Sequence, residues 1–238
     1  MAGPDVLKVT RHVAGPHPCV YFPERKMRAV VVGAAPEDKA AVYSRLAPLG
    51  FRRTGSVYYA PRCEGCNACI SLRVKAGEFA PNRRFRRVLR RNADLQTVAT
   101  ARDEEPVEHF ALYQRYIKGR HAGGSMDPPS PADYIQLAHP AGMETIALDI
   151  RQDGRLVASA VTDVLDHGLA AVYTYFDPSM SDRSLGVFAI LEQIAECRRR
   201  GLPYLYLGYW IEESDKMRYK ADFGPAEVLI NGNWSPLP

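Results

Sequence analysis

The stretch FDPSMSDRSLGVFA, residues 176–189, joins two segments with different hydrophobic patterns. The segment before it, LAAVYTYF at 169–176, is short and rich in β-branched and aromatic residues, which predicts a strand. The segment after it, at 184–201, has the apolar spacing of an amphipathic helix. A helix that starts directly after a strand presents free backbone N–H groups and the positive end of its dipole. We therefore expect this junction to bind an anion.

The elements around the junction follow a recognisable order. Residues 145–152 and 155–165 predict two further strands of an antiparallel meander, with turns at QDG and DHG. A strand at 204–210, a helix at 214–224 and a strand at 226–232 follow the central helix. This order is that of the GNAT-like acyltransferase fold. The chain is therefore predicted to be an α+β protein, with a C-terminal mixed sheet flanked by helices.

A GNAT-like fold carries a phosphate-binding loop, R-x-x-G-x-G/A, before its central helix. Arg183 and Gly186, in RSLG, match the first half of that pattern and are candidate substrate-binding residues. Phe188 stands where Gly or Ala is expected, so the match is partial. An ordinary helix start is the alternative interpretation.

The first part of the chain predicts a smaller α/β unit. Its expected strands lie at 27–33, 56–61, 70–77 and 94–101, and its expected helices at 35–50 and 82–92. The charged stretch ARDEEP indicates a boundary, so we expect an N-terminal unit at 1–102 and a C-terminal domain at 103–238. A helix at 106–119 and a short helix capped by Ser130 follow this boundary.

Composition and charge narrow the class of protein. The 238 residues are 46% hydrophobic and 24% charged, which is typical of a soluble globular protein whose core needs no disulfides. The net charge of +4 is modest, but arginines cluster between Arg83 and Arg91, which indicates a polyanionic partner. The sequence contains no signal peptide pattern and no apolar run long enough to span a membrane. We expect a cytoplasmic protein that does not bind a membrane.

Three cysteines, Cys63, Cys66 and Cys69, form a C-x₂-C-x₂-C run. This spacing is typical of the thiolate ligands of iron–sulfur clusters and zinc sites. A closed site needs a fourth ligand, and Cys19 is the candidate, whereas Cys197 in the amphipathic helix is expected to be a buried thiol. We predict a structural or regulatory metal site at Cys19, Cys63, Cys66 and Cys69. Reduced thiols in a tight turn are the alternative.

Seven stretches together resemble the arginyl-tRNA–protein transferase family, and within it the bacterial aspartate/glutamate leucyltransferases. They are PHPCVYFPERKMR, LGFRRTGSVYYAPRCEGCNACISLRV, FAPNRRFRRVLRRNADL, YIKGRHAGGSMDPPSPADY, VYTYFDP, RSLG and YLYLGYWIEESDKMRYKADFGPAEVLINGNW. They keep one order from about residue 10 to 235, which is more specific than any single motif. One departure is Ser71, where bacterial members usually have proline.

The resemblance implies a reaction and its partners. An aminoacyl group moves from the 3′ end of a charged tRNA to the α-amine of a protein's N-terminal residue. In the bacterial branch the donor is leucyl-tRNA and the acceptor begins with Asp or Glu. The product is marked for degradation by the N-end rule pathway. Arginine as the transferred residue is the alternative within the family.

The implied chemistry is aminolysis of an ester by an amine with an unperturbed pKa of about 7.7–8.0. The reaction requires no cofactor, because the enzyme has only to align amine and ester, accept a proton and stabilise an oxyanion. The candidate catalytic residues in the C-terminal strands and loops are Tyr175, Asp177, Tyr209 and Lys216. Tyr173 and Tyr206 are further candidates, and packing within a strand is the alternative for every tyrosine.

An acidic N-terminal residue on the acceptor requires a cationic pocket. The candidates are Arg120 and His121 in the glycine-rich loop, together with Lys216 and Lys220 in the expected helix at 214–224. For all four, a solvated surface position is the alternative.

The arginine-rich helix at 82–92 is the candidate tRNA-binding element. Positive charge around most of a helix is self-repelling unless an anion compensates it. The phosphates of a tRNA acceptor stem are suitable anions. The candidate contacts are Arg83, Arg84, Arg87, Arg90 and Arg91, and Arg86 is the sixth arginine of the helix. A solvated face is the alternative for this helix.

Two functions of other classes compete with this interpretation. An acetyltransferase that uses acetyl-CoA would fit the partial phosphate loop, but it leaves the cysteine run and the arginine-rich helix without a role. A non-catalytic tRNA-binding module with a zinc knuckle would leave the C-terminal half without a role. Titration with acetyl-CoA, uncharged tRNA and charged tRNA separates the three.

Overall fold

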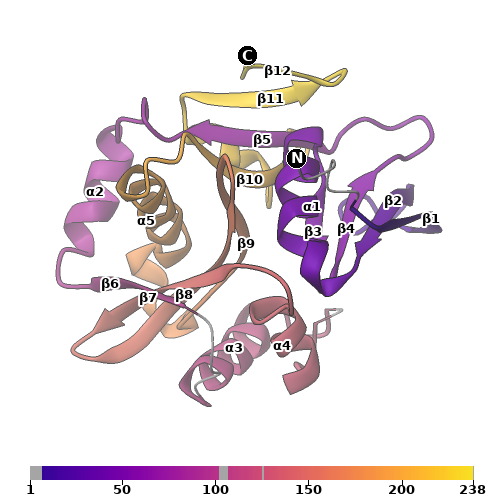
Figure 1. Cartoon of the computed structure of the whole chain (residues 1–238). Helices are drawn as coiled ribbons and strands as arrows, with labels where there is room; N and C mark the ends of the chain where they lie inside the picture. Colours follow the sequence, from indigo (N-terminus) through magenta and orange to yellow (C-terminus); the bar gives the residue numbers. More distant parts are fainter. Residues whose placement is uncertain (1–6, 102–106, 125, 238) are drawn as a thin grey trace, which may run out of the picture.

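The computed structural model describes residues 7–101, 107–124 and 126–237, and these form a mixed α+β protein with two sheets, as predicted (Figure 1). The larger sheet contains β5 (Ile70–Lys75), β6 (Gln96–Ala101), β7 (Thr145–Gln152), β8 (Arg155–Leu165), β9 (Gly168–Phe176), β10 (Tyr204–Trp210), β11 (Ala226–Ile230) and β12 (Asn233–Pro236). The smaller sheet contains β1 (Val9–Pro18), β2 (Lys26–Ala34), β3 (Arg52–Thr54) and β4 (Val57–Pro61). The α-helices are α1 (Lys39–Leu46), α2 (Arg83–Arg91), α3 (Val107–Arg120), α4 (Pro131–Ala138) and α5 (Leu185–Arg199).

Strands from both halves of the sequence build the larger sheet. Its order is β12-β11-β5-β10-β9-β8-β7-β6, so β5 lies between β11 and β10, and β6 forms the opposite edge (Figure 1). Strand β5 and helix α2 precede residue 102, yet they share a core with α5. The expected boundary itself falls at residues 102–106, which lie outside the described residues. The division into two domains stays a prediction.

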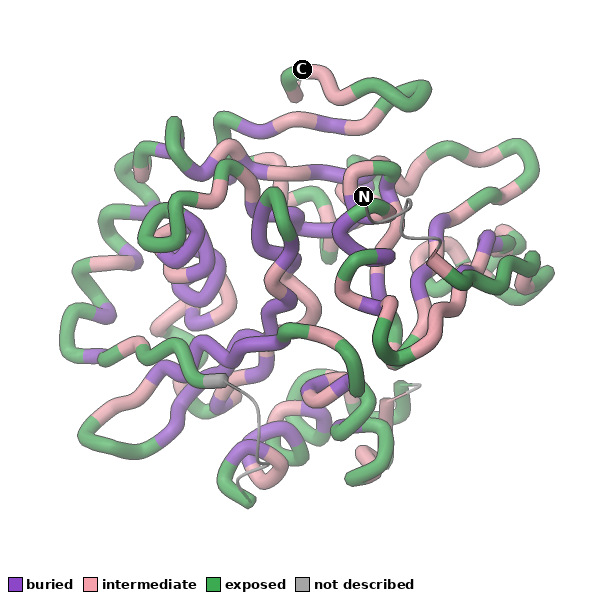
Figure 2. Tube along the Cα trace, in the orientation of Figure 1, coloured by how far each residue is buried: buried purple, intermediate pink, exposed green. Residues whose placement is uncertain are grey.

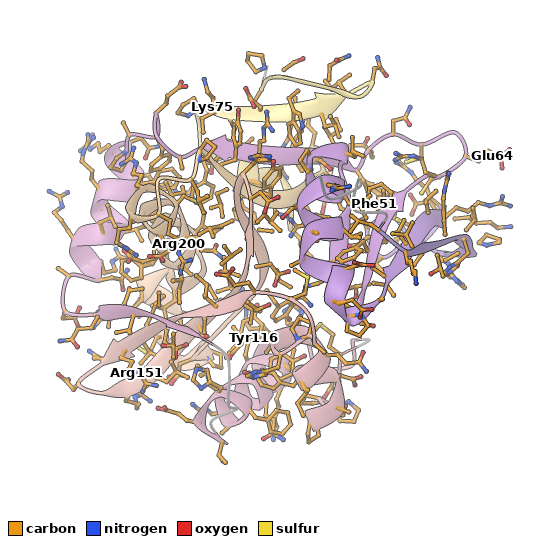
Figure 3. All side chains as sticks on the ribbon, in the orientation of Figure 1. Phe51, Glu64, Lys75, Tyr116, Arg151 and Arg200 are labelled. Carbon is orange, nitrogen blue, oxygen red and sulfur yellow. The ribbon has the colours of Figure 1, made fainter. Side chains whose placement is uncertain are left out.

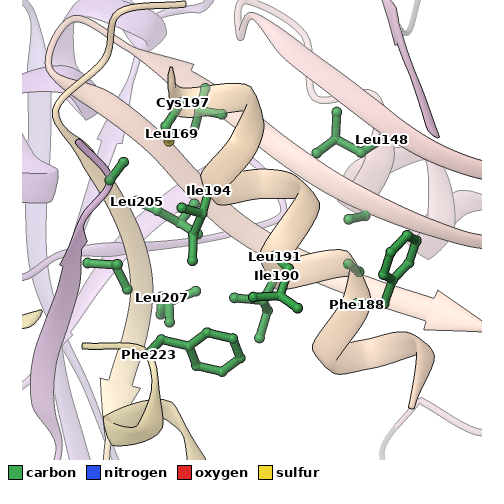
Figure 4. Close-up of a cluster of buried hydrophobic side chains, with 14 of the residues drawn as sticks. Leu148, Leu169, Phe188, Ile190, Leu191, Ile194, Cys197, Leu205, Leu207 and Phe223 are labelled. Carbon is green, nitrogen blue, oxygen red and sulfur yellow. The ribbon is translucent and has the colours of Figure 1, made fainter. Parts of the chain in front are cut away.

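Helix α5 packs its apolar side against one face of the larger sheet. Phe188, Leu191 and Ile194 contact Leu148, Leu169 and Leu205 of the strands in a continuous core (Figure 4). Burial of each such side chain stabilises the fold by about 1.5–3 kcal/mol. Strands β7 and β8 are buried along most of their length, because helices cover both of their faces (Figure 2).

The opposite face of the larger sheet is covered by α3 and α4. Tyr113 and Tyr134 from these helices pack against Tyr175 of β9, with ring centroids of 5.6 and 5.9 Å to Tyr175. Ser130 caps α4 and accepts a hydrogen bond from Asp133 N at 3.1 Å, as predicted. The two helices therefore bring the glycine-rich loop between them close to β9.

A buried ion pair joins the smaller sheet to the larger one. Arg53 of β3 donates to both carboxylate oxygens of Asp163 on β8, at 2.6 and 3.0 Å. Its remaining N–H groups donate to the carbonyl oxygens of Gly55, Gln136 and Leu137. The side chains of Arg53 and Asp163 are 1% and 0% exposed, so this bidentate pair fixes the position of β3.

Two expected helices differ from prediction. The segment 214–224 forms only a 3₁₀ turn, η4 (Arg218–Asp222), because its backbone bonds are mostly of the i to i+3 type, such as Met217 N to Ser214 O and Phe223 N to Lys220 O. The helix at 35–50 is divided into a 3₁₀ turn at Pro36–Asp38, α1, and a second 3₁₀ turn at Ala47–Leu49, where Pro48 interrupts the helix.

Three strands were not predicted. Strand β1 has a mostly exposed pattern interrupted by glycine and proline, and β3 and β12 are only 3 and 4 residues long. Short or exposed strands give no alternating pattern of apolar residues, so they are recognised only by their pairing.

Candidate active site

Strands β9 and β10 separate in the middle of the larger sheet. Their parallel pairing ends after Ala170 and Tyr206. The pairing register of each strand with its other neighbour also shifts close to this point, as expected for bulges that bend a strand. Residues 171–174 are half-buried, whereas residues 168–170 are buried. We call the point beyond Ala170 and Tyr206 the β9–β10 fork.

Arg52, which sequence reasoning missed, occupies this fork. Its Nη1 donates to Tyr206 O on β10 at 3.3 Å, and its Nη2 donates to Ala171 O on β9. Gly208 has φ +84°, and a Cβ there would lie 3.0 Å from Arg52 Nε. The adjacent pair Arg52 and Arg53 in β3 was the available signal, since alternate residues of a strand point to opposite faces.

Lys220 and Tyr209 lie next to Arg52. Lys220 Nζ donates to Tyr209 O at 3.0 Å. Burial and, to a smaller extent, the charge of Arg52 lower the pKa of Lys220 to about 7, while Cys69 opposes the shift. The single O–H of Tyr209 is shared between Gly50 O at 3.1 Å and Tyr59 O at 3.2 Å, and burial raises its pKa. The Tyr209 hydroxyl therefore binds backbone carbonyls, while its carbonyl orients Lys220.

A second cluster forms where α3 meets the loop after β10. His121 Nε2 lies 3.3 Å from the Tyr116 hydroxyl, and Tyr116 packs edge-on against Phe176, with 4.9 Å between the ring centroids. Burial lowers the pKa of His121, and the charges of Lys216 and Arg120 lower it further. The structure therefore brings Arg120, His121 and Lys216 together, and it keeps the imidazole neutral near pH 7.

Tyr175 and Tyr173 differ in their polar contacts. The Tyr175 hydroxyl is buried and shares a 2.7 Å hydrogen bond with the Tyr134 hydroxyl. Tyr173 packs against Tyr113 and Tyr116, and its buried hydroxyl has no hydrogen-bond partner among the described residues. Burial raises the pKa of Tyr173, so the phenol is protonated and can donate.

Asp177 stabilises the turn after β9. It accepts hydrogen bonds from Ser179 N at 3.0 Å and Ser179 Oγ at 2.6 Å, and it pairs with Arg155 at 3.1 Å. Burial acts to raise the pKa of Asp177, but the bonds from Ser179 and the charges of Arg155 and Arg115 outweigh burial and lower it. A carboxylate held in this way is a weak base.

The start of α5 is joined to the end of α2. Arg183 donates to Asp94 Oδ1 at 2.6 Å and to Arg91 O at 3.1 Å, and Asn92 Nδ2 donates to Arg183 O at 2.9 Å. Gly186 lies in the first turn of α5, where a Cβ would meet the Phe176 ring at 3.4 Å. Arg183 thus fixes the junction between the two helices.

Helix α2 forms as predicted, with Asn82 as its N-cap. Phe85 and Val88 are buried, and all six arginines are exposed. Arg84 pairs with Asp222, Arg91 donates to Asp182 O, and Arg86 donates to Pro81 O. The other three, Arg83, Arg87 and Arg90, have no bonding partner within the described part of the chain.

The four N-terminal cysteines line one cavity of about 650 Å³ between the two sheets. Tyr209, Gly50, Arg25 and Arg62 also line it. Burial, together with the thiols of Cys19, Cys63 and Cys66, raises the pKa of Cys69 to about 12, so the four sulfurs lie close enough to interact. Glu64 marks the outer tip of the loop that carries three of them (Figure 3).

The thiols are not arranged as metal ligands. No group of three or more His, Cys, Asp or Glu within the described ranges has the geometry to hold a metal ion. Arg25 Nη1 donates to Cys66 Sγ at 3.7 Å, and Cys63 Sγ donates to Arg28 O at 3.6 Å. Cys197 is buried in α5, as predicted.

Across the described ranges of the chain, no helix has the length and apolar character needed to cross a bilayer.

Two family models match this chain. The model described as arginine-tRNA-protein transferase, N terminus, covers residues 17–87, and the model for the C terminus covers residues 108–230. The chain belongs to the arginine-tRNA-protein transferase family. The resemblance inferred from the sequence is thereby confirmed.

Curated relatives match over nearly their whole length. An aspartate/glutamate leucyltransferase from Marinobacter nauticus is 46% identical over 224 residues, which is 93% of either chain. A Hahella chejuensis protein of the same name is 46% identical over 92% of this chain and 93% of that one. A Pseudomonas aeruginosa protein of that name is 42% identical over 98% of this chain and 99% of that one.

Solved structures give weaker matches. The C-terminal domain of a lysylphosphatidylglycerol synthetase from Agrobacterium fabrum has a TM-score of 0.47 at 15% identity, over 73% of this chain and 52% of that one. L-PGS from Bacillus licheniformis has a TM-score of 0.48 at 9% identity, over 73% of this chain and 50% of that one.

Proposed function

We propose that this protein transfers leucine from leucyl-tRNA to the N-terminal α-amine of proteins that begin with Asp or Glu. The observation that carries the proposal is the near full-length identity of 46% to a relative named for this activity. The reaction takes place in the cytoplasm and marks the acceptor for N-end rule degradation.

The element order supports a GNAT-like acyltransferase fold. Strand β6, helices α3 and α4, strands β7 to β9, helix α5 and strand β10 follow one another as that fold requires. Helix α5 follows the strand that diverges from its neighbour. We place the reaction at the β9–β10 fork. Lys220 binds the backbone of β10, the Tyr116–His121 pair packs against Phe176 at the end of β9, and α5 is the next helix after β9.

The chain supplies proximity and proton transfer. The acceptor amine loses a proton when it attacks the ester carbonyl, and the 3′ hydroxyl of the tRNA gains one as it leaves. His121, with its lowered pKa, is neutral and can accept the proton, while Lys216 beside it is the candidate donor to the oxyanion. The Tyr173 hydroxyl, which lacks a partner in the described structure, is a further oxyanion donor.

The other predicted site residues support these groups. Tyr175 fixes β9 through Tyr134, Asp177 fixes the turn before α5, and Tyr209 orients Lys220. Arg120 and Lys220 are the proposed partners of the acidic N-terminal residue of the acceptor, and Lys220 is favoured in its protonated form when that anion is bound. Arg183 and Gly186 shape the start of α5, where the terminal phosphates of the tRNA would lie.

Helix α2 is the proposed contact for the tRNA acceptor stem. Its exposed arginines continue from the start of α5, since Arg91 and Arg183 meet at that point. Phosphate contacts of this kind fix register without reading sequence.

The N-terminal thiols are not needed for ester aminolysis. A metal ion or iron–sulfur cluster at Cys19, Cys63, Cys66 and Cys69 would act on stability or regulation, and the loop would have to move to bind it, because the described geometry does not fit one. Metal analysis of anaerobically purified protein checks this, with less than about a tenth of an equivalent favouring free thiols.

A transfer assay tests the function. The protein is mixed with leucyl-tRNA or arginyl-tRNA and with peptides that begin with Asp, Glu, Lys or Ala, and the peptides are weighed by mass spectrometry. The expected result is a leucine mass on the Asp and Glu peptides alone. The family model names arginine, so an arginine mass would identify the second candidate function. No mass on any peptide, with tRNA binding intact, would contradict both.

A further inference from the structure

Arg52 is a partly buried cation without a carboxylate partner. Five other described arginines are not fully exposed, and each forms an ion pair: Arg25, Arg53, Arg73, Arg151 and Arg183. Across the part of the chain that the structure describes, Arg52 forms none. A guanidinium that is withdrawn from water without a counter-ion lowers stability, so its retention at this position requires a reason.

The guanidinium is held in a fixed orientation at the β9–β10 fork. It bonds the carbonyls of Ala171 and Tyr206, one on each strand, at the point where their pairing stops. Gly208 leaves room for it, since a Cβ there would lie 3.0 Å from Arg52 Nε, which is tighter than an ordinary van der Waals contact. The two carbonyls accept one N–H from each terminal nitrogen. The remaining N–H groups of the planar guanidinium can therefore bind an anion.

The surroundings of Arg52 are cationic or neutral. Lys220 lies close enough for the two positive charges to interact. Arg52 also acts electrostatically on the phenols of Tyr21, Tyr43, Tyr59 and Tyr209, which are all protonated because burial raises their pKa values. Asp163, which also acts on Tyr43, is already bound by Arg53 and Thr145. An anion beside Arg52 would reduce the repulsion between the guanidinium and a protonated Lys220, so it would be stabilised by both groups.

We propose that Arg52 binds the side-chain carboxylate of the acceptor's N-terminal Asp or Glu, with Lys220 beside it. The proposal rests on the proposed function, since it takes the acidic acceptor from there. The carboxylate and the attacking α-amine belong to the same residue, so anchoring one at the fork positions the other for the ester. A chain end is also thin enough to enter between two strands, whereas a tRNA phosphate is flanked by nucleotides on both sides.

The test compares acceptor specificity in Arg52→Gln and in the unmodified protein. Matched peptides that begin with Asp or with Asn are assayed for kcat/KM with leucyl-tRNA. We expect Arg52→Gln to lower kcat/KM for the Asp peptide by about 10²-fold or more, and to leave the slow reaction of the Asn peptide within about twofold. Arg45→Gln, at an exposed position on α1, is the control and should change neither value.

The outcomes separate the possible failures. An unchanged Asp-to-Asn ratio in Arg52→Gln would overturn the proposal. Weaker leucyl-tRNA binding with the ratio preserved would also overturn it, because Arg52 would then bind a phosphate. Failure of the unmodified protein to transfer leucine to the Asp peptide would instead contradict the proposed function.

A measurement on the unmodified protein covers the case in which Arg52→Gln does not fold. Phenylglyoxal modifies accessible arginines, and peptide mapping reports the modification of Arg52. An Asp peptide should slow modification of Arg52, and an Asn peptide should not. Equal protection by both peptides, or protection by neither, would contradict the assignment.

Discussion

Helix α2 and strand β3 both carry neighbouring arginines, and the two elements use them in opposite ways. The six arginines of α2 are exposed around a thin buried seam, and three of them have no bonding partner within the described structure. Arg53 of β3 is 1% exposed and donates to Asp163 and to three carbonyl oxygens. Arg52, one residue before it, points to the other side and reaches the fork.

The difference shows how far solvent decides the role of an arginine. On α2 the charge is hydrated, so each residue contributes little to stability and is available to a large anion. In β3 the charge is removed from water, so each N–H group needs a defined acceptor. Substitution of Arg53 should therefore affect stability, and substitution of Arg52 should affect catalysis. Substitution of the arginines on α2 should affect only tRNA affinity.

The largest expected effect on stability is that of Arg53→Ala. The change leaves Asp163 buried without its counter-ion and should lower the free energy of unfolding by about 3–5 kcal/mol. Urea denaturation measures this, with Arg87→Ala on α2 as the matched control, expected to change stability by less than about 0.5 kcal/mol. Equal effects at the two positions would remove the contrast between β3 and α2.

The next effect concerns the space that Gly208 leaves for Arg52. Gly208→Ala places a Cβ at φ +84° against Arg52 Nε and should destabilise by about 1–2 kcal/mol from backbone strain alone. It should also reduce transfer to Asp peptides, because Arg52 must move. Gly201→Ala is the control, since Gly201 has φ +67° with open space around it. If Gly208→Ala were destabilised but transferred leucine as well as Gly201→Ala does, Arg52 would tolerate displacement.

Charge reversal on α2 should weaken tRNA binding without affecting the fold. Arg87→Glu combined with Arg90→Glu removes two exposed cations. The slope of log affinity against log salt should become shallower by about 2, because about one counterion is released per phosphate contact. Filter binding over a range of salt concentrations measures the slope. An unchanged slope would show that the arginines of α2 form a solvated face and do not contact tRNA phosphates.

The smallest expected effect is a shift in the titration of His121. Burial, Lys216 and Arg120 lower the pKa of His121 below its usual 6.5, so the neutral form persists as the pH falls below that value. This depressed pKa contributes stability that is complete above the unfolded pKa and is lost as the pH falls through the folded one. Lys216→Gln removes a positive charge and should raise the pKa of His121. An NMR titration of the imidazole reports the direction, and a pKa that fell or stayed constant would show that Lys216 is distant.

The sequence by itself determined the local features of this protein. The period of apolar residues predicted the meander and α5, Ser130 and Asn82 sit at the helix starts that their side chains favour, and Phe85 and Val88 form the seam of α2. The linear order of motifs identified the family. All of these signals depend on residues within a few turns or strands of one another, which is why a pattern in one sequence reveals them.

Only the tertiary structure decided which groups meet at the site. Arg52 reaches Ala171 and Tyr206, which follow it by 119 and 154 residues, and no periodicity links such positions. The segment expected as a helix at 214–224 forms only the 3₁₀ turn η4, and its Lys220 side chain binds Tyr209 O of β10. The role of each arginine then follows from its burial and from the acceptors that the fold brings within reach. Arg53 forms a buried ion pair, Arg52 bonds two carbonyls without a carboxylate partner in the described structure, and the arginines of α2 are hydrated surface charges.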